Sequence, residues 1–204
     1  MGRNTGPRVK KMRALDVELP GLSRKSIAKR PYRPGQHGQG SQRVKDYTLR
    51  LNEKQKLRFN YGLTERQLRR VVREAVRSKT LTGDKIIELL ERRLDNVVFR
   101  GGLAPTIPAG RQLVNHNHVT VNDKRVNIAS YRVKVGDVIR PREKSVQLQP
   151  IQIALAEGPA LDYPAWLEFD ESTVSIRIAS LPNADSVPFP IELSLVVEFY
   201  AQLL

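Results

Sequence analysis

A change of hydrophobic period between residues 91 and 140 constrains the fold of this 204-residue chain more than any other feature. The pattern first predicts a helix that begins at Thr82-Gly83-Asp84 and runs towards Leu94, with further apolar side chains at helical spacing at Val97 and Val98. This helical pattern is expected to end at Gly101-Gly102, because glycine weakens a helix interior and readily takes positive φ. Beyond residue 118 the period becomes two, as in half-buried strands. The order predicts a pair of helices followed by a short antiparallel sheet.

A second helix is predicted to begin at Thr106. The Thr106 hydroxyl can cap its first turn, and Pro108 is tolerated there because an N–H at that position would lack a helical partner in any case. The first N–H groups of such a helix lie close to Arg111 and Gln112. A helix start beside a guanidinium is a favourable seat for a phosphate group.

The period-two segment is expected to form two short hairpins. The first combines Val119 and Val121, a turn at residues 122–124, and a return strand through Val126 and Ile128. The second combines Val133, Val135, a turn at Gly136-Asp137, and Val138 with Ile139. Further along we expect a short helix at residues 150–156, a strand pair at 166–170 and 173–178, and a final apolar helix at 191–204. The last segment would equally suit a core strand on periodicity alone.

The clearest helix pattern follows Thr64, which makes a capping-box pattern with Gln67. Its apolar stripe consists of Leu68, Val71, Val72, Ala75 and Val76. Its polar face carries Arg66, Arg69, Arg70, Arg73 and Arg77, and the helical pattern upstream, from Asp46, adds Lys54, Lys56 and Arg58. A charged helix face is usually only solvated. Here Glu65 and Glu74 alone balance five arginines, and this excess favours an anionic partner.

The net charge of +14 is concentrated in the first 145 residues. Residues 1–60 carry 16 Lys and Arg against four Asp and Glu, and residues 61–145 carry 18 against nine. Residues 146–204 reverse the sign, with Arg177 alone against eight acidic residues. RNA, DNA or an acidic membrane surface would satisfy the basic part, because cations gain mainly by releasing counterions. A membrane is the weakest of the three, since the sequence has no apolar stretch of about 18 residues.

The first 45 residues are expected to form a basic, extended arm. They combine many cations with Gly and Pro and have few apolar side chains, so they bury little surface. Two interpretations remain: a flexible solvated tail, or an arm that folds against RNA. Tyr32 and His37, set among cations, favour the second, because planar side chains stack on unpaired bases. The chain has no cysteine, so we expect RNA or the arm's own packing, and not a thiolate zinc site, to order it.

Several segments carry a recognisable pattern: LLERRLDNVVFR (residues 89–100), APTIPAGRQLVNH (104–116), VTVNDKRVNIASYRVKVGD (119–137), RPYRPGQHG (30–38), LNEKQKLRFNYGLTERQLRR (51–70) and SLVVEFY (194–200). The first three resemble the αL RNA-binding module. Together the segments extend over nearly the entire chain, which is identified as a member of the family of bacterial and organellar small-subunit ribosomal protein four. Gly101 and Gly110 depart from the family pattern, which usually has a bulkier apolar residue and an alanine. Gly110 is expected to cost about 0.5–1 kcal/mol relative to alanine and to soften the second helix.

The resemblance implies an α+β fold in three parts. A basic arm (residues 1–45) precedes a helical rRNA-binding domain (46–91) that a terminal helix (191–204) completes, and an αL module with additional antiparallel strands (92–190) is inserted between them. The implied function is that of a structural constituent of the small ribosomal subunit, in the cytoplasm or in a plastid. Such a protein binds a 16S-type rRNA early, at the five-way junction of its 5′ domain, and nucleates assembly of the subunit body. The resemblance also implies neighbouring ribosomal proteins near the mRNA entry channel and a contribution to translational accuracy.

Two other functions are weighed against this one. An RNA-modifying enzyme with an αL module as its clamp would need a larger catalytic domain than the residues after Arg142 can form. A basic quality-control factor that binds ribosomes transiently would need little beyond the module. His116 and His118 could share one face of a strand as metal ligands, but two ligands do not make a site. We therefore expect no catalytic residue, metal, cofactor or small-molecule substrate.

The candidate RNA-binding residues are Arg3, Lys10, Lys11, Arg13, Arg24, Lys25, Lys29, Arg30, Tyr32, Arg33, His37, Arg43, Lys54, Lys56, Arg58, Arg66, Arg69, Arg70, Arg73, Arg77, Arg93, Arg100, Thr106, Arg111, Gln112, His116, His118, Lys124 and Arg125.

Overall fold

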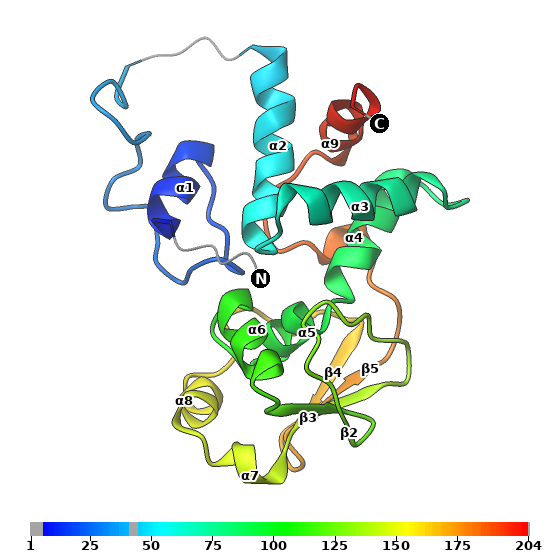
Figure 1. Ribbon diagram of the computed structural model, residues 1–204. Coiled ribbons are helices and arrows are strands. Elements are labelled where there is room, and N and C mark those ends of the chain that lie inside the picture. Colours follow the sequence, from blue (N-terminus) through cyan, green and yellow to red (C-terminus); the bar gives the residue numbers. More distant parts are fainter. Residues whose placement is uncertain (1–5, 41–44, 204) are drawn as a thin grey trace. The chain divides into compact units, whose positions relative to one another are not determined.

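The computed structural model describes residues 6–40 and 45–203, and the chain divides into two compact units (Figure 1). Unit 1 combines the residues up to 86 with those from 187 onwards, and unit 2 is formed by residues 87–186. The division falls inside helix α4 (Thr82–Glu91). Helices dominate unit 1 and unit 2 contains an antiparallel sheet, so the fold is α+β, as the sequence predicts.

Unit 1 is built from α1 (Arg8–Leu15), α2 (Asp46–Asn60), α3 (Glu65–Val76), the first part of α4, and α9 (Leu193–Ala201). The terminal helix α9 packs against α2 and α3, and its buried residues Val196, Phe199 and Tyr200 join their core. The predicted capping box opens α3. Thr64 Oγ1 accepts a hydrogen bond from the Gln67 N–H (3.3 Å), and the Thr64 N–H donates to Gln67 Oε1 (3.0 Å).

The arm differs from the extended segment that the sequence predicts, because α1 and the residues after it pack on their own chain. A short series of apolar side chains is buried there: Met12, Val17, Leu19 and Leu22. The N–H of Gly21 donates to Asn60 Oδ1 (2.9 Å), and Lys11 Nζ lies 5.1 Å from the centre of the Phe59 ring. Apolar residues are few in the arm as a whole, but they are concentrated between residues 12 and 22. This apolar cluster packs residues 12–22 against the end of α2.

Unit 2 places a helical pair on a five-stranded antiparallel sheet. The pair is α5 (Leu94–Arg100) and α6 (Ile107–Asn115), and α7 (Glu143–Val146), α8 (Gln149–Glu157) and the 3-10 helix η1 (Ala184–Ser186) complete the unit. The strands are β1 (Val119–Val121), β2 (Lys124–Arg125), β3 (Val138–Pro141), β4 (Leu167–Asp170) and β5 (Ser175–Ile178), in the order β2-β1-β3-β5-β4. Helix and sheet share one apolar core, which includes Val97, Val98, Val114, Ile139 and Ile176.

The sequence predicts one continuous helix towards Leu94, but α4 and α5 are separate. Arg93 between them has an extended backbone (φ −69°, ψ 135°). The Val133 N–H donates to Arg92 O (2.9 Å), and the Leu94 N–H donates to Tyr131 O (2.8 Å). These bonds to a segment 40 residues away take the backbone out of the helix, so the break is a tertiary effect that local periodicity does not reveal.

The two predicted hairpins are also only partly correct. The turn of the first is Asn122-Asp123, with positive φ at both residues (48° and 63°), and its return strand ends at Arg125, which leaves Ile128 59% exposed. The structure describes residues 133–139 in full, and no hairpin forms there. Instead β3 pairs with β1 on one side and with β5 on the other. The later strand pair, β4 and β5, and helix α8 occur where predicted.

Gly110 allows α6 to approach α5 closely. A Cβ atom at this position would lie 2.7 Å from the backbone oxygen of Asp95 and 3.4 Å from Val98 Cγ1. The expectation that Gly110 softens its helix rests on helix propensity and stays a prediction, but the structure adds that the absent side chain is what permits this contact. At Gly101 a Cβ would meet Ile176 Cδ1 at 2.2 Å, so the second departure from the family pattern also makes room for packing.

We predict that G110A lowers the free energy of unfolding by about 1–3 kcal/mol, since overlap with the α5 backbone outweighs the gain in helix propensity of about 0.5–1 kcal/mol. Urea unfolding of the variant and the unchanged chain measures the difference. A gain in stability would show that α6 can move away from α5 at little cost.

Candidate nucleic-acid interface

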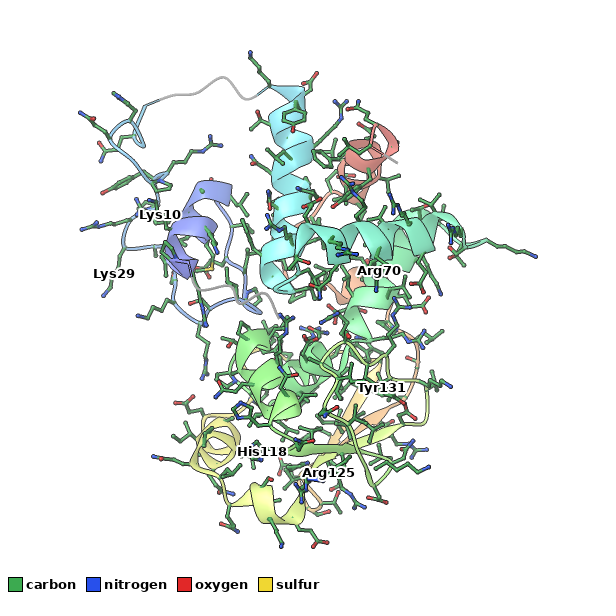
Figure 2. All side chains as sticks on the ribbon, viewed as in Figure 1. Lys10, Lys29, Arg70, His118, Arg125 and Tyr131 are labelled. Atoms are coloured by element: carbon green, nitrogen blue, oxygen red, sulfur yellow. The ribbon has the colours of Figure 1, made fainter. Side chains whose placement is uncertain are left out.

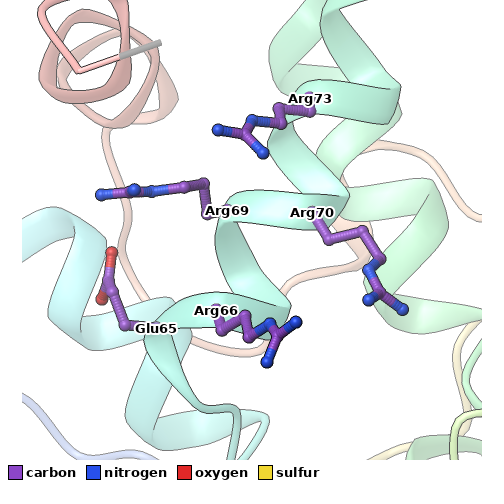
Figure 3. A pocket seen from close by; sticks show the side chains of 5 residues that line it. All are labelled: Glu65, Arg66, Arg69, Arg70 and Arg73. Atoms are coloured by element: carbon purple, nitrogen blue, oxygen red, sulfur yellow. The ribbon is translucent and has the colours of Figure 1, made fainter.

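The polar side of α3 forms a cationic surface, the α3 arginine face, made of Arg66, Arg69, Arg70, Arg73 and Arg77. The opposite side of the helix is buried in unit 1 through Leu68, Val71, Val72 and Ala75, whereas Val76, predicted as part of that stripe, is 56% exposed. Four of the five arginines, together with Glu65, line a hollow of about 500 Å³. Figure 3 shows Arg69 and Arg73 extending to one side of the helix and Arg66 and Arg70 to the other. The helix therefore presents guanidinium groups at a fixed pitch.

Two arginine nitrogen atoms of unit 1 are buried hydrogen-bond donors without an acceptor in the described part of the chain. Within the described residues, the Nε atoms of Arg58 and Arg69 have no hydrogen-bond partner. A buried donor left without an acceptor costs roughly 1–3 kcal/mol. A phosphate oxygen is an acceptor that suits a guanidinium, so the exposed arginines of the α3 arginine face, rather than these two buried atoms, favour an anionic ligand.

Glu65 begins α3 and connects three helices of unit 1. Its carboxylate accepts a hydrogen bond from Lys54 Nζ of α2 (2.9 Å) and from the Tyr200 hydroxyl of α9 (2.7 Å). Partial burial alone would raise the pKa of Glu65, but these two hydrogen bonds and the nearby positive charges outweigh it and hold the pKa below its ordinary value. Burial, followed by the hydrogen bond to Glu65, raises the pKa of Tyr200, so its hydroxyl remains the donor.

This network removes Lys54 from the candidate surface. Lys54 is 5% exposed, and its Nζ lies 4.8 Å from the centre of the Phe199 ring in addition to its ion pair with Glu65. Lys56 is likewise occupied, by Glu53 (2.6 Å) and by the backbone oxygen of Pro190 (3.2 Å). Both cations thus hold α9 and its preceding segment to α2.

In unit 2 the arginines predicted to bind RNA meet buried carboxylates. Asp95 is fully buried and accepts hydrogen bonds from Arg93 (3.0 and 2.8 Å) and from Arg111 (2.9 and 2.7 Å). Arg100 lies 3.8 Å from the buried Glu91 and donates to the backbone oxygen of Ser186 (3.1 Å). Glu91 and Asp95 therefore hold arginine side chains in place within unit 2. Arg93 and Arg100 are 7% and 6% exposed, so they serve the fold and offer no surface for RNA.

The start of α6 is capped as predicted, because Thr106 Oγ1 accepts a hydrogen bond from the Ala109 N–H (3.4 Å). Thr106 itself is buried, whereas Gln112 and His116 are exposed. His118 lies against Ser145, with 3.0 Å between Nδ1 and Oγ, and burial, followed by the nearby His116 and Arg142, lowers its pKa. In the part of the chain that the structure describes, no three metal-ligating side chains come together around these histidines or elsewhere.

Lys124 and Arg125 are exposed on the β1–β2 hairpin. Figure 2 shows Arg125 there. The register of the sheet adds a residue that the sequence did not identify, because Thr120 of β1 pairs with Arg125 on one side and with Arg140 on the other. Directly opposite residues of neighbouring strands share one face of a sheet, so Arg140 extends the cationic end of the hairpin. Only the strand pairing could have revealed this. Arg140 also forms an ion pair with Asp123.

Of the eight candidate cations of the arm that the structure describes, five are exposed: Lys10, Arg24, Lys25, Lys29 and Arg30. Figure 2 shows Lys10 on α1 and Lys29 on the segment that follows it. Burial, followed by the charges of Arg58 and Arg8, lowers the pKa of Lys11. Tyr32 is 37% exposed and His37 is exposed, while Arg33 is half-buried. Arg3 and Arg43 lie outside the described residues.

Helical cations, a basic hairpin and the α5–α6 pair on an antiparallel sheet define the class of RNA-binding proteins built on an αL module. Residues 3–91 match the family model of the ribosomal protein S4/S9 N-terminal domain, and residues 92–139 match that of the S4 domain. The two matches meet where α4 ends. Among the residues that the structure describes, none of the helices is long and apolar enough to cross a membrane.

Full-length relatives agree with the two family models. The chain is 53% identical over 206 residues to the small ribosomal subunit protein uS4 of Methylobacillus flagellatus, with 100% of both chains covered. It is 54% identical to the uS4B protein of Nitrosomonas europaea, with 98% of each covered, and 48% identical to the uS4c protein of Cyanophora paradoxa, with 99% of this chain and 100% of the relative covered. The chain belongs to the family of small ribosomal subunit protein uS4. This confirms the resemblance found in the sequence, and the family consists of ribosomal proteins, not enzymes.

We predict that E65Q lowers stability more near neutral pH than in acid. Because the folded-state pKa of Glu65 is below its ordinary value of 4.5, its stabilising contribution is present above that value and is lost as the pH falls through the folded-state pKa. Melting temperatures near pH 7 and at about pH 3 measure this, and the difference between variant and unchanged chain should shrink at the lower pH. An equal difference at both values would assign the effect to packing alone.

We predict that D95N lowers the free energy of unfolding by about 3–5 kcal/mol, because the buried Arg93 guanidinium and the partly buried Arg111 guanidinium lose their counter-charge. Asp162 is exposed, so D162N is a matched control with an expected change within about 0.5 kcal/mol. Urea unfolding compares the two variants. Similar values for both would mean that the Arg93 and Arg111 charges find solvent without cost.

Proposed function

We propose that this chain is a structural constituent of the small ribosomal subunit that binds a 16S-type rRNA directly, at the five-way junction of the 5′ domain. It docks early and nucleates assembly of the subunit body. Its neighbours are the ribosomal proteins near the mRNA entry channel, where it contributes to translational accuracy. The ribosome concerned lies in the cytoplasm or in a plastid.

The α3 arginine face carries this proposal. Four arginines around one hollow, with Glu65 as the single carboxylate in the lining, present a charge that a sugar–phosphate backbone neutralises. The relatives are named as small ribosomal subunit proteins over the full length of this chain, which supports rRNA as the polyanion.

The α6 start and the β1–β2 hairpin are a second proposed contact region. Lys124 and Arg125 are exposed there, beside Arg140 on the neighbouring strand. Arg111, which is also expected to bind RNA, has a role in the fold as well, because its guanidinium holds Asp95. Replacement of Arg111 would therefore test the fold as much as RNA binding, whereas replacement of Lys124 tests the surface.

The experiment is a footprint on naked small-subunit rRNA. We predict that the purified protein protects one confined junction without other proteins present, and that R70A and K124A weaken binding and each reduce the salt slope of log K by about one. The matched control is R177A, which also removes one positive charge, from a position directly opposite Glu168 on the neighbouring strand. Nitrocellulose filter binding at several salt concentrations measures affinity.

Equal affinity for any RNA duplex would contradict this proposal and favour a transient quality-control factor. A larger loss of affinity in R177A than in R70A and K124A would show that the binding surface has been assigned to the wrong residues.

A further inference from the structure

A second, apolar hollow lies in the N-terminal part of unit 1, apart from the α3 arginine face. It has a volume of about 690 Å³ and is lined by Val9 and Arg13 of α1 and by residues 25–30. Most of its lining is apolar, and Val9, Ile27 and Ala28 contribute to it. Four cationic residues also belong to the lining: Arg13, Lys25, Lys29 and Arg30. The hollow thus combines apolar surface with positive charge, and apolar patches on a protein surface often mark binding sites.

The wall formed by residues 25–30 is held in shape by Glu18. One oxygen of its carboxylate, Oε1, accepts hydrogen bonds from Ser26 Oγ (2.5 Å) and from the Ile27 N–H (3.2 Å). Ser26 Oγ in turn accepts from the Ala28 N–H (3.1 Å). The hydrogen bonds from Ser26 and then Ile27 hold the pKa of Glu18 below its ordinary value, so the carboxylate stays ionised. The hollow is thus preformed, and no carboxylate is among its lining residues.

The Arg13 side of the hollow is also fixed. Arg13 Nε donates to the backbone oxygen of Tyr32 (3.0 Å), and the guanidinium carbon lies 5.0 Å from the centre of the Tyr32 ring. This contact joins α1 to the segment that carries the exposed Tyr32. The Arg13 guanidinium, which lines the hollow, therefore lies against the Tyr32 ring.

A ligand for this hollow must combine an uncharged, largely apolar body with negative charge next to it. A nucleotide has this form, since its base is planar and sequence-tolerant in stacking while its phosphates are anionic. A base can enter only where it is unpaired, because bases within a duplex are stacked and hydrogen-bonded. We propose that this hollow, the base pocket, receives one unpaired base of the rRNA, with the adjoining phosphates on Lys25, Lys29 and Arg30. This inference rests on the proposed function and adds a specific ligand to it.

The test fills the pocket without changing the charge. Ala28 lines the pocket and is exposed, so A28F should block the pocket and leave the fold intact. The matched control is A14F, an equal substitution at an exposed position of α1 that is not part of the lining. The probe is naked small-subunit rRNA, treated with base-specific reagents for exposed bases and with hydroxyl radicals for the backbone.

With the unchanged protein and with A14F, we expect one unpaired base to become unreactive within the protected junction. With A28F that base should regain its reactivity while the backbone footprint elsewhere persists, and affinity should fall about 5- to 100-fold, as expected for the loss of one stacked base. Circular dichroism and a melting curve verify folding. If A28F melts at a lower temperature, A28L, which fills less of the pocket, replaces it.

Identical base reactivity and affinity for A28F and A14F would overturn the base pocket while the proposed function stands. The absence of a confined footprint with the unchanged protein would instead overturn the proposed function. A base that stays protected in A28F, together with weaker binding, would also reject the pocket, because its protection would then come from another surface.

Discussion

The fold of unit 2 depends on one buried carboxylate. Asp95 receives two guanidiniums, one from Arg93 just before α5 and one from Arg111 on α6, and its backbone oxygen lies where Gly110 lets α6 come close. A buried carboxylate is costly unless it is both paired and hydrogen-bonded, and both oxygens of Asp95 accept hydrogen bonds. The arrangement orients α5 and α6 with respect to each other. The helix start and the hairpin of the module are built on that pair.

In unit 1 a carboxylate likewise joins helices, although it is only partly buried. Glu65 connects Lys54 of α2 with Tyr200 of α9, which fastens the terminal helix to the N-terminal helices. The basic residues discussed above, within the described part of the chain, therefore fall into two groups. One group neutralises buried or half-buried carboxylates and stabilises the fold, and the other is exposed on α3, on the hairpin and in the arm. Net charge alone does not distinguish the groups, although only the second is available to a polyanion.

Predictions from the sequence were most reliable for elements whose conformation depends on residues close by in the chain. The capping box at Thr64, the helix start at Thr106, the positive φ at Gly102 and the strand pair β4–β5 all follow from side chains within a few residues of the element. They were least reliable where a distant segment competed. Residues 131–133 divide the predicted long helix at Arg93, and β3 pairs with β1 and β5 in place of the predicted second hairpin. The candidate site shows the same division, because exposure of the α3 arginines follows from helical period, whereas burial of Arg93 and Arg100 does not.

By itself the sequence determined the α+β class, the family, the basic character of the first 145 residues, and the helix face on which the α3 arginines lie. These properties depend on composition and on spacing along the chain, which folding cannot alter. The tertiary structure alone decided which basic side chains pair with Asp95, Glu91 and Glu65. It also decided that Gly110 lies in close contact with α5, and that residues 25–30 enclose an apolar hollow with Val9 and Arg13. Each of these is a contact between segments far apart in the chain or joined by a turn, and its energy depends on burial and distance, which exist only once the chain has folded.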